Sequence, residues 1–230
     1  MRSPAAEAMR AAQDCLEGAY DLAGLPGRLR GSLRWQERKE GELGATHALA
    51  TGALLGLPAA RLAEELEKRM KLPPLFSAVA AVDGFLNFRL SDAWYDEALN
   101  RLCAKAPGDA PDLSSARFPA LDPALAPRQD AASPLYRLRW AYERSRALLA
   151  DESAPDGEHR WGEAERALLR RIILSEGESG LFDLADAFSR FYAVRPIRSA
   201  ADKGFRLKLC AAFCRRVEES GADTRAQRHP

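Results

Sequence analysis

The hydrophobic pattern of the first half of the chain changes between helical and strand periodicity. Residues 4–23 carry small and apolar side chains at helical spacing, and residues 58–70 open with a proline and repeat leucines on one side. Residues 44–56 are small and apolar enough for a buried helix, whereas residues 32–38 alternate as a strand does. These segments predict helices mixed with strands.

The next segment, residues 74–90, is rich in β-forming side chains around the dipeptide Asp83-Gly84. This dipeptide favours the tight turn of a hairpin. Ser91 is suited to cap a following helix, which we expect to run to about Lys105. The pattern therefore predicts a first domain over residues 1–105 with an α+β fold, in which helices accompany a small antiparallel sheet.

A proline-rich segment separates this domain from the rest of the chain. Six prolines fall within a short stretch, namely Pro107, Pro111, Pro119, Pro123, Pro127 and Pro134. Because proline interrupts helices and the hydrogen-bond ladders of central strands, neither element is expected here. We interpret residues 106–133 as a linker or an extended strap.

Helical periodicity continues from Pro134 to the end and predicts an all-α helical bundle over residues 134–230. The expected helices cover residues 135–150, 161–176, 180–194 and 199–220. In the first of them, Leu138, Ala141, Ser145 and Leu148 fit an inward face. A break is expected near Gly204, and residues 221–230 are expected to be loose.

The strand at residues 85–90 has two distinct faces because side chains alternate along a strand. Leu86, Phe88 and Leu90 form an ordinary core face. Phe85, Asn87 and Arg89 fall on the other face, where a ring, an amide and a guanidinium group would be shown to solvent. This trio is a candidate binding surface. The alternative is that Asn87 is a turn or cap residue and that Phe85 packs on a helix.

The helix that begins near Pro134 mixes aromatic rings with arginines. Between residues 134 and 150 there are four arginines and one acidic residue, Glu143. Rings between guanidinium groups suit RNA, whose unstacked bases lie on rings and whose phosphates pair with arginine. The alternative, a solvated basic face with rings packed into the bundle, is the commoner outcome for such stripes. The candidates here are Tyr136, Arg139, Trp140, Arg144 and Arg146, and Arg190 and Arg195 lie at the rim of a later helix.

Composition limits the class of protein. The hydrophobic share of 47% and the charged share of 29% indicate a folded chain, and a net charge of +1 gives no electrostatic argument for nucleic acid. Neither a membrane span nor an apolar signal region is visible, and four scattered cysteines do not make a disulfide framework. We therefore expect a cytoplasmic protein.

The sequence offers no motif of a catalytic or cofactor site. It contains neither a phosphate-binding loop nor a glycine-rich dinucleotide fingerprint, so no cofactor is expected. Cys210 and Cys214 share a helix face but lack further ligands, so they are interpreted as core residues and not as a metal site. His47 is interpreted as a half-buried residue with its hydrogen bonds satisfied.

Four motifs, in this order, together resemble the arginyl-tRNA synthetases. They are, in chain order, GELGATHALATGALLGLPAARLAEEL at residues 41–66, GFLNFRLSDAW at residues 84–94, PLYRLRWAYERSRALL at residues 134–149 and DLADAFSRFYAVRPI at residues 183–197. The first two resemble the N-terminal tRNA-binding domain of that family. The last two resemble its C-terminal anticodon-binding domain, called the DALR domain.

The chain also departs from that family. A synthetase has a nucleotide-binding catalytic domain between these two, with HIGH-like and KMSKS-like signatures, and residues 106–134 are far too few for such a domain. The final residues GADTRAQRHP also lack the family's usual ending, which puts recognition of the anticodon in doubt.

The resemblance implies a non-catalytic tRNA-binding protein, which would act on an arginine tRNA as a chaperone, a regulator or a delivery subunit for a tRNA-modifying enzyme. Phe85, Asn87 and Arg89 would face the D-loop side of the tRNA, with a stacking plane, an amide for a base edge and a charge for a phosphate. Two alternatives stay open: an assembly module that binds proteins and has lost RNA, or the tRNA-binding subunit of a split synthetase.

Overall fold

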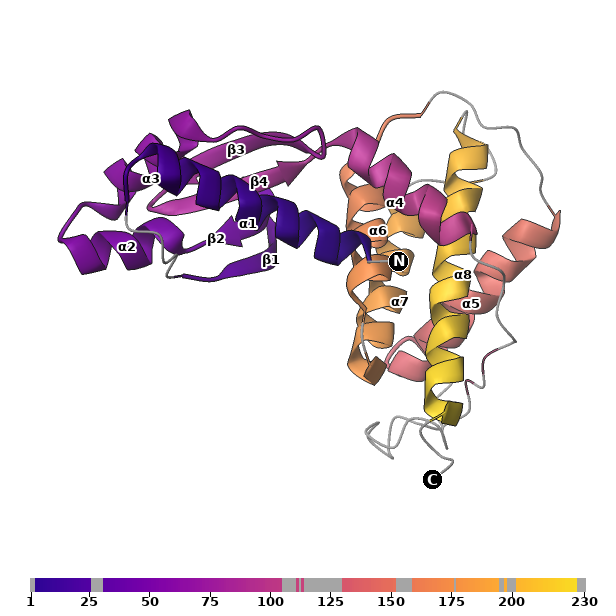
Figure 1. The fold of residues 1–230 in the computed structure, drawn as a ribbon. Helices are drawn as coiled ribbons and strands as arrows, with labels where there is room; N and C mark the ends of the chain where they lie inside the picture. The colour runs from indigo at the N-terminus through magenta and orange to yellow at the C-terminus, as the bar shows by residue number, and fades with distance from the viewer. Residues whose placement is uncertain are drawn as a thin grey trace. The chain divides into compact units, whose positions relative to one another are not determined.

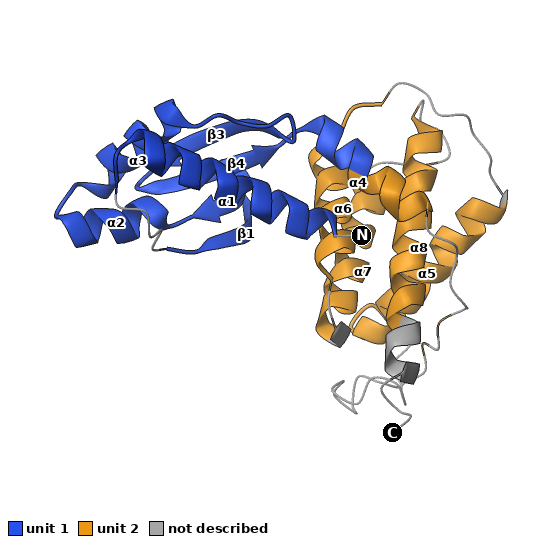
Figure 2. Ribbon diagram, in the orientation of Figure 1, with its two compact units in different colours: residues 1–97 blue, residues 98–230 orange. Residues whose placement is uncertain are grey.

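The computed structural model describes residues 3–25, 31–104, 111, 113, 130–151, 159–175, 177–194, 197 and 202–226. The chain divides into two compact units, residues 1–97 and residues 98–230 (Figures 1 and 2). The boundary falls inside helix α4 (Asp92–Ala104), whereas the sequence pattern had placed the end of the first domain at residue 105. Most of the predicted linker, residues 106–133, lies outside the described residues.

The first unit has the predicted α+β fold, built on a four-stranded antiparallel sheet. Its strands are β1 (Leu33–Arg38), β2 (Gly41–Ala45), β3 (Phe76–Val82) and β4 (Phe85–Leu90), in the order β1-β2-β4-β3. The turn between β3 and β4 uses Asp83 and Gly84, both with positive φ, as expected of this dipeptide. The predicted hairpin is therefore confirmed.

Three helices lie wholly within the first unit: α1 (Pro4–Leu22), α2 (His47–Leu55) and α3 (Ala59–Arg69). The Ser3 side chain caps α1 by accepting a hydrogen bond from the Ala6 N–H at 3.2 Å. The inner face of the sheet carries Leu43, Leu86 and Phe88, all without solvent exposure. Because β2 and β4 pair Leu43 with Phe88, these side chains form one apolar layer at the centre of the unit.

The prediction for residues 44–56 was wrong at its start, since Gly44 and Ala45 belong to strand β2. Small residues fit this strand because Gly41 lies against the backbone of β4, where an added Cβ would approach the Phe88 carbonyl oxygen to 2.5 Å. The small side chains of strand β2 are therefore explained by close packing between strands and not by a buried helix.

The second unit is all-helical, as predicted. Its long helices are α5 (Pro134–Asp151), α6 (Glu163–Leu174), α7 (Gly177–Val194) and α8 (Lys203–Ala226). Leu138, Ala141, Ser145 and Leu148 are buried, which confirms the inward face expected for α5. Phe188 and Phe213 meet in the core with ring centroids 4.7 Å apart.

Two predictions for the last helix were wrong. Gly204 does not interrupt it, because α8 begins at Lys203 and continues through the glycine in its first turn, and residues 199–201 of the predicted helix lie outside the described residues. The helix also continues to Ala226, so most of the segment expected to be loose is helical in its backbone. Among the described residues, no helix is both long and apolar enough to cross a bilayer.

Candidate nucleic-acid interface

The side chains of Phe85, Asn87 and Arg89 on strand β4 are not all exposed to solvent, although strand alternation predicted that they would be. Arg89 is exposed and Phe85 is partly exposed, but Asn87 is only 2% exposed. The expectation that all three side chains face solvent is therefore wrong for Asn87. It lies on the outer face of the sheet, which we define by Arg34, Gln36, Gly44, Phe85 and Asn87, and a neighbouring strand covers it.

The side chain that covers Asn87 is Gln36 of β1. Its Nε2 donates to Asn87 Oδ1 at 2.9 Å and to the Gly41 carbonyl oxygen at 3.2 Å. Asn87 Nδ2 in turn donates to the carbonyl oxygen of Ala80 at 3.2 Å. Strand pairing places Gly44 between these two side chains, since Gly44 pairs with Arg34 on one side and with Asn87 on the other. The glycine leaves the room in which the Gln36 amide lies.

Two arginines, one on β1 and one on β4, make further contacts in this sheet. The Arg38 guanidinium lies over the Phe85 ring, with its Cζ 5.5 Å from the ring centroid. Arg89 donates to the Lys39 carbonyl oxygen in the turn between β1 and β2. The outer face thus combines a ring, amides and guanidinium groups, although not through the side chains that the sequence pattern indicated.

The second unit brings aromatic rings together on helices α5 and α7. Trp140 and Tyr136 of α5 are 37% and 36% exposed. Trp140 makes edge contacts with Tyr192 and Phe188 of α7, with ring centroids 5.7 and 6.4 Å apart. Phe188 and Tyr192 stack at 6.0 Å with an interplanar angle of 17°. One side of this cluster is therefore anchored in the core through Phe188, and the other reaches solvent through Trp140.

Arg144 binds the same cluster. Its Nε donates to the Tyr192 hydroxyl at 2.7 Å, its Nη2 donates to the same oxygen, and its Cζ lies 5.2 Å from the Tyr192 ring centroid. Tyr136, Trp140 and Arg144 follow one another at intervals of four residues, so they share one face of α5. We call Tyr136, Trp140, Arg144 and Tyr192 the α5–α7 surface.

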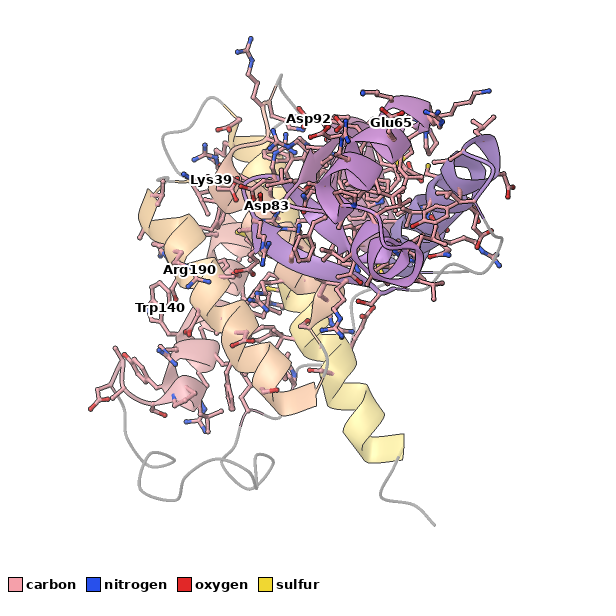
Figure 3. The ribbon with its side chains drawn as sticks, turned by 90° about the vertical axis from the view of Figure 1, so that its left-hand side faces the viewer. Lys39, Glu65, Asp83, Asp92, Trp140 and Arg190 are labelled. Atoms are coloured by element: carbon pink, nitrogen blue, oxygen red, sulfur yellow. The ribbon has the colours of Figure 1, made fainter. Side chains whose placement is uncertain are left out.

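The other arginines that the sequence indicated as candidates differ in the hydrogen bonds and ion pairs that they make. Arg139 donates to the carbonyl oxygen of Leu113 at 2.7 Å, and exposed Arg146 lies 3.4 Å from the buried carboxylate of Glu218. Arg190 is exposed on α7 and has no hydrogen bond or ion pair with any described residue. Figure 3 labels its side chain and that of Trp140 on the second unit. Arg195 lies outside the described residues.

Sequence reasoning missed three contributors to these surfaces. Gln36 and Arg38 belong to a strand whose partner was not recognised, so no pattern in the sequence connects them with Asn87. Tyr192 recurs at helical spacing with Phe188, a spacing typical of core positions, but it is partly exposed and its hydroxyl accepts a hydrogen bond from Arg144. Its position four residues after Phe188 was the available signal.

Three buried titratable groups, Cys210, Cys214 and His47, lie outside these surfaces. Burial raises the pKa of the Cys210 and Cys214 thiols to about 12, so both are protonated and unreactive at neutral pH. Their interpretation as core residues is confirmed by their burial. His47 is 3% exposed, more buried than expected, and its Nδ1 has no hydrogen-bond partner. No cluster of metal-binding side chains occurs in the described part of the chain.

Comparison with known proteins gives little further help. No family model and no curated protein matches the chain. Among solved structures, the arginyl-tRNA synthetase of Thermus thermophilus aligns with a TM-score of 0.35 and 19% sequence identity, over 96% of this chain and 37% of the synthetase chain. The chain thus corresponds to little more than a third of the length of that enzyme, and the alignment is too loose for fold or function to be inferred from it.

Proposed function

We propose that the chain is a non-catalytic tRNA-binding protein related to the arginyl-tRNA synthetases and that an arginine tRNA is its ligand. The observation that carries this proposal is the α5–α7 surface, where an exposed indole lies against a tyrosine that also holds an arginine. The order of the synthetase-like motifs supports the choice of tRNA. The absence of phosphate-binding motifs from the sequence supports a role without catalysis.

The chemistry of the α5–α7 surface matches an unstacked RNA loop. Bases of single-stranded RNA stack on aromatic side chains and on arginine planes, and each stacked base is worth about 1–3 kcal/mol. Trp140 and Tyr136 supply the exposed rings. On a different face of α7, exposed Arg190 supplies a charge with no partner among the described residues. The Arg144 contact with Tyr192 holds the cluster in place before a ligand arrives, which lowers the entropy lost on binding.

The direct test is binding of a labelled arginine tRNA transcript to the purified chain, measured by fluorescence anisotropy. Trp140→Ala is expected to weaken binding by about tenfold or more, the loss of one stacked base. Arg190→Ala is also expected to weaken it, whereas Arg160→Ala is not. Arg160 is a matched control because it is exposed, lies in the same unit and has no described partner. A parent chain that binds no tRNA at low salt would refute the proposal.

The same preparation tests the absence of catalysis. Without a phosphate-binding element, the chain alone is expected neither to hydrolyse ATP nor to attach arginine to tRNA. Aminoacylation by the purified chain would contradict this expectation. Aminoacylation that appears only when a second protein is added would instead support the reading of the chain as the tRNA-binding subunit of a split synthetase.

A protein-assembly role is the second candidate, and one observation favours it. Leu54, Leu55 and Leu57, at the end of α2 and just after it, are all exposed. Neighbouring exposed leucines are more typical of a protein contact than of an RNA contact. A stoichiometric protein partner that is lost in Leu54→Ser, together with no tRNA binding, would put this candidate first.

A further inference from the structure

Strand β1 forms one edge of the sheet, and some of its backbone groups point away from the neighbouring strand β2 (Figure 1). Hydrogen-bonded residues alternate along an antiparallel pair of strands. The Thr46 N–H donates to the Ser32 carbonyl oxygen at 2.9 Å, so the alternation makes Arg34 the next residue bonded to β2. The N–H and C=O groups of Leu33 and Trp35 therefore face outward, and these N–H groups have no partner among the described residues.

The opposite edge of the sheet, strand β3, is partly blocked. The Glu67 carboxylate of α3 accepts the outward-facing N–H of Ala81 at 3.0 Å. Unpaired sheet edges are templates for the addition of a further strand, and natural proteins commonly block them with charges or covering elements. Among the described residues, no side chain blocks the N–H groups of Leu33 and Trp35 in this way. The β1 edge is therefore the more open to an added strand.

The side chains beside these backbone groups favour a strand of alternating chemistry. Leu33 and Trp35 lie on the inner face of the sheet, because Trp35 pairs with buried Leu43, and both are partly exposed. Apolar side chains at the inward positions of an added strand would bury them further. Arg34 lies between them on the outer face, is exposed, and has no hydrogen bond or ion pair with any described residue. An acidic residue fits opposite Arg34, because cross-strand pairs of opposite charge stabilise a sheet.

A second copy of the chain fits this edge poorly. In a two-fold antiparallel pairing through both outward-facing residues, Leu33 of each copy would lie opposite Trp35 of the other, and the two Arg34 side chains would face each other. Like charges directly opposite each other destabilise a sheet. RNA also matches the edge less well, because alternating N–H and C=O groups are complementary to another peptide backbone. The edge thus favours a peptide of complementary charge.

We propose that the β1 edge is a docking site for an extended acidic segment of a partner protein, which adds a strand beside residues 33–35 of the four-stranded sheet. Two apolar residues of the segment exchange backbone hydrogen bonds with Leu33 and Trp35, and the acidic residue between them pairs with Arg34. The backbone hydrogen bonds supply affinity in such contacts, and the alternate side chains supply specificity. This inference goes beyond the proposed binding of tRNA and does not depend on it.

The probe is the capped peptide acetyl-Ser-Glu-Val-Glu-Val-Glu-Ser-amide. NMR titration of the isotope-labelled full chain gives the affinity, and amide hydrogen exchange shows which N–H groups become protected. A saturating concentration of the peptide is expected to slow exchange at Leu33 and Trp35. Exchange at Arg34 is expected to change little, because its N–H is already bonded to β2. Unchanged exchange at Leu33 and Trp35 would overturn the proposal.

Two control peptides separate the backbone contact from the charge contact. N-methylation of both valines removes the N–H groups that donate to β1, and it is expected to weaken binding by about tenfold or more, the effect of two hydrogen bonds. Lysine in place of every glutamate keeps the backbone and is expected to weaken binding by about three- to tenfold. An N-methylated peptide that binds as tightly as the parent peptide would show that no strand is added.

Variants of the protein test the same two contacts. Leu33→Pro removes an outward-facing N–H, which an edge strand tolerates, and is expected to weaken binding of the glutamate peptide by about threefold or more. Arg34→Glu is expected to reverse the preference, so that the lysine peptide binds more tightly than the glutamate peptide. A misfolded variant would bind neither peptide. Arg61→Glu on α3, a matched control exposed in the same unit, is expected to keep the preference of the parent chain. Retention of that preference by Arg34→Glu would overturn the assigned pairing.

Other occupants of the edge give different results in the same exchange experiment. A uridine hexamer is expected to leave exchange at Leu33 and Trp35 unchanged, whether or not the α5–α7 surface binds tRNA. If the hexamer protects these two amides and the peptide does not, the edge is an RNA contact and the proposal is wrong. If the amides become protected in the chain alone as its concentration rises, a second copy occupies the edge, which would equally overturn the proposal.

Discussion

At the scale of single residues, Phe85 and Phe88 provide an internal comparison within strand β4. Phe88 has no solvent exposure and its ring centroid lies 5.1 Å from that of Phe76, so Phe88→Ala is expected to lower the free energy of unfolding by about 3–5 kcal/mol. Phe85 is partly exposed and the Arg38 guanidinium lies over its ring. Phe85→Ala should therefore lower the free energy of unfolding by only about 1–2 kcal/mol. Urea denaturation of both variants measures this difference, and equal losses would place Phe85 in the core.

His47 makes the stability of the first unit sensitive to pH. Burial lowers its pKa below the ordinary value of 6.5, so the folded state holds the imidazole neutral while the unfolded chain protonates it. Because the unfolded state then binds more protons, the free energy of unfolding is expected to fall as the pH drops below about 6.5.

Denaturant titrations between about pH 7.5 and about pH 5, where most carboxyl groups stay ionised, measure this effect. His47→Gln cannot take up a proton at this position, so its unfolding free energy should vary less with pH than that of the parent. The same slope in both proteins would show that another group is responsible.

Residue-level reasoning from the sequence succeeded for one face of β4 and failed for the other. Alternation assigns Leu86, Phe88 and Leu90 to the core, and all three are buried. Burial of Asn87 depends instead on Gln36, which lies far away in the sequence and reaches it across a glycine. A period-two pattern describes a strand by itself, and it contains no information on what a neighbouring strand places over it.

At the scale of elements, one hydroxyl group adds hydrogen bonds to the ring contacts between α5 and α7. Tyr192 accepts hydrogen bonds from Arg144, and the Tyr136 hydroxyl has no partner among the described residues. Tyr192→Phe is expected to lower the free energy of unfolding by about 1–2 kcal/mol, because it removes hydrogen bonds from a charged donor. Tyr136→Phe should change it by less than about 0.5 kcal/mol. Thermal denaturation of the two variants compares them, and equal melting temperatures would contradict the structural role of the hydroxyl group.

The elements that sequence patterns predicted well are those with long apolar repeats. Helices α1, α3, α5, α6 and α7 all have the expected type, since a helical repeat over three turns has few alternatives. Strand β2 was missed because its residues Gly41, Gly44 and Ala45 are small for reasons of strand packing that composition does not reveal. The end of α8 was missed because a polar segment near a terminus resembles an unstructured tail.

For the whole molecule, the near-neutral charge decides how strongly RNA binding should depend on salt. The chain has 34 basic and 33 acidic residues, and Arg139, Arg144 and Arg146 each engage another group of the protein. Little uncompensated positive charge is therefore available to displace counterions from phosphates. The plot of log affinity for tRNA against log salt concentration is expected to be shallow, with a slope that indicates about two to four phosphate contacts.

Two variants distinguish the contribution of charge to this salt dependence from the contribution of base stacking. Arg190→Ala removes a cation with no described partner and should reduce the slope by about one phosphate contact. Trp140→Ala removes a ring without charge, so it should weaken binding at every salt concentration and leave the slope unchanged. If the slope instead falls with Trp140→Ala and not with Arg190→Ala, the α5–α7 surface does not bind RNA through a stacked base beside a paired phosphate. The basic residues that neutralise phosphates would then have to be sought elsewhere in the chain.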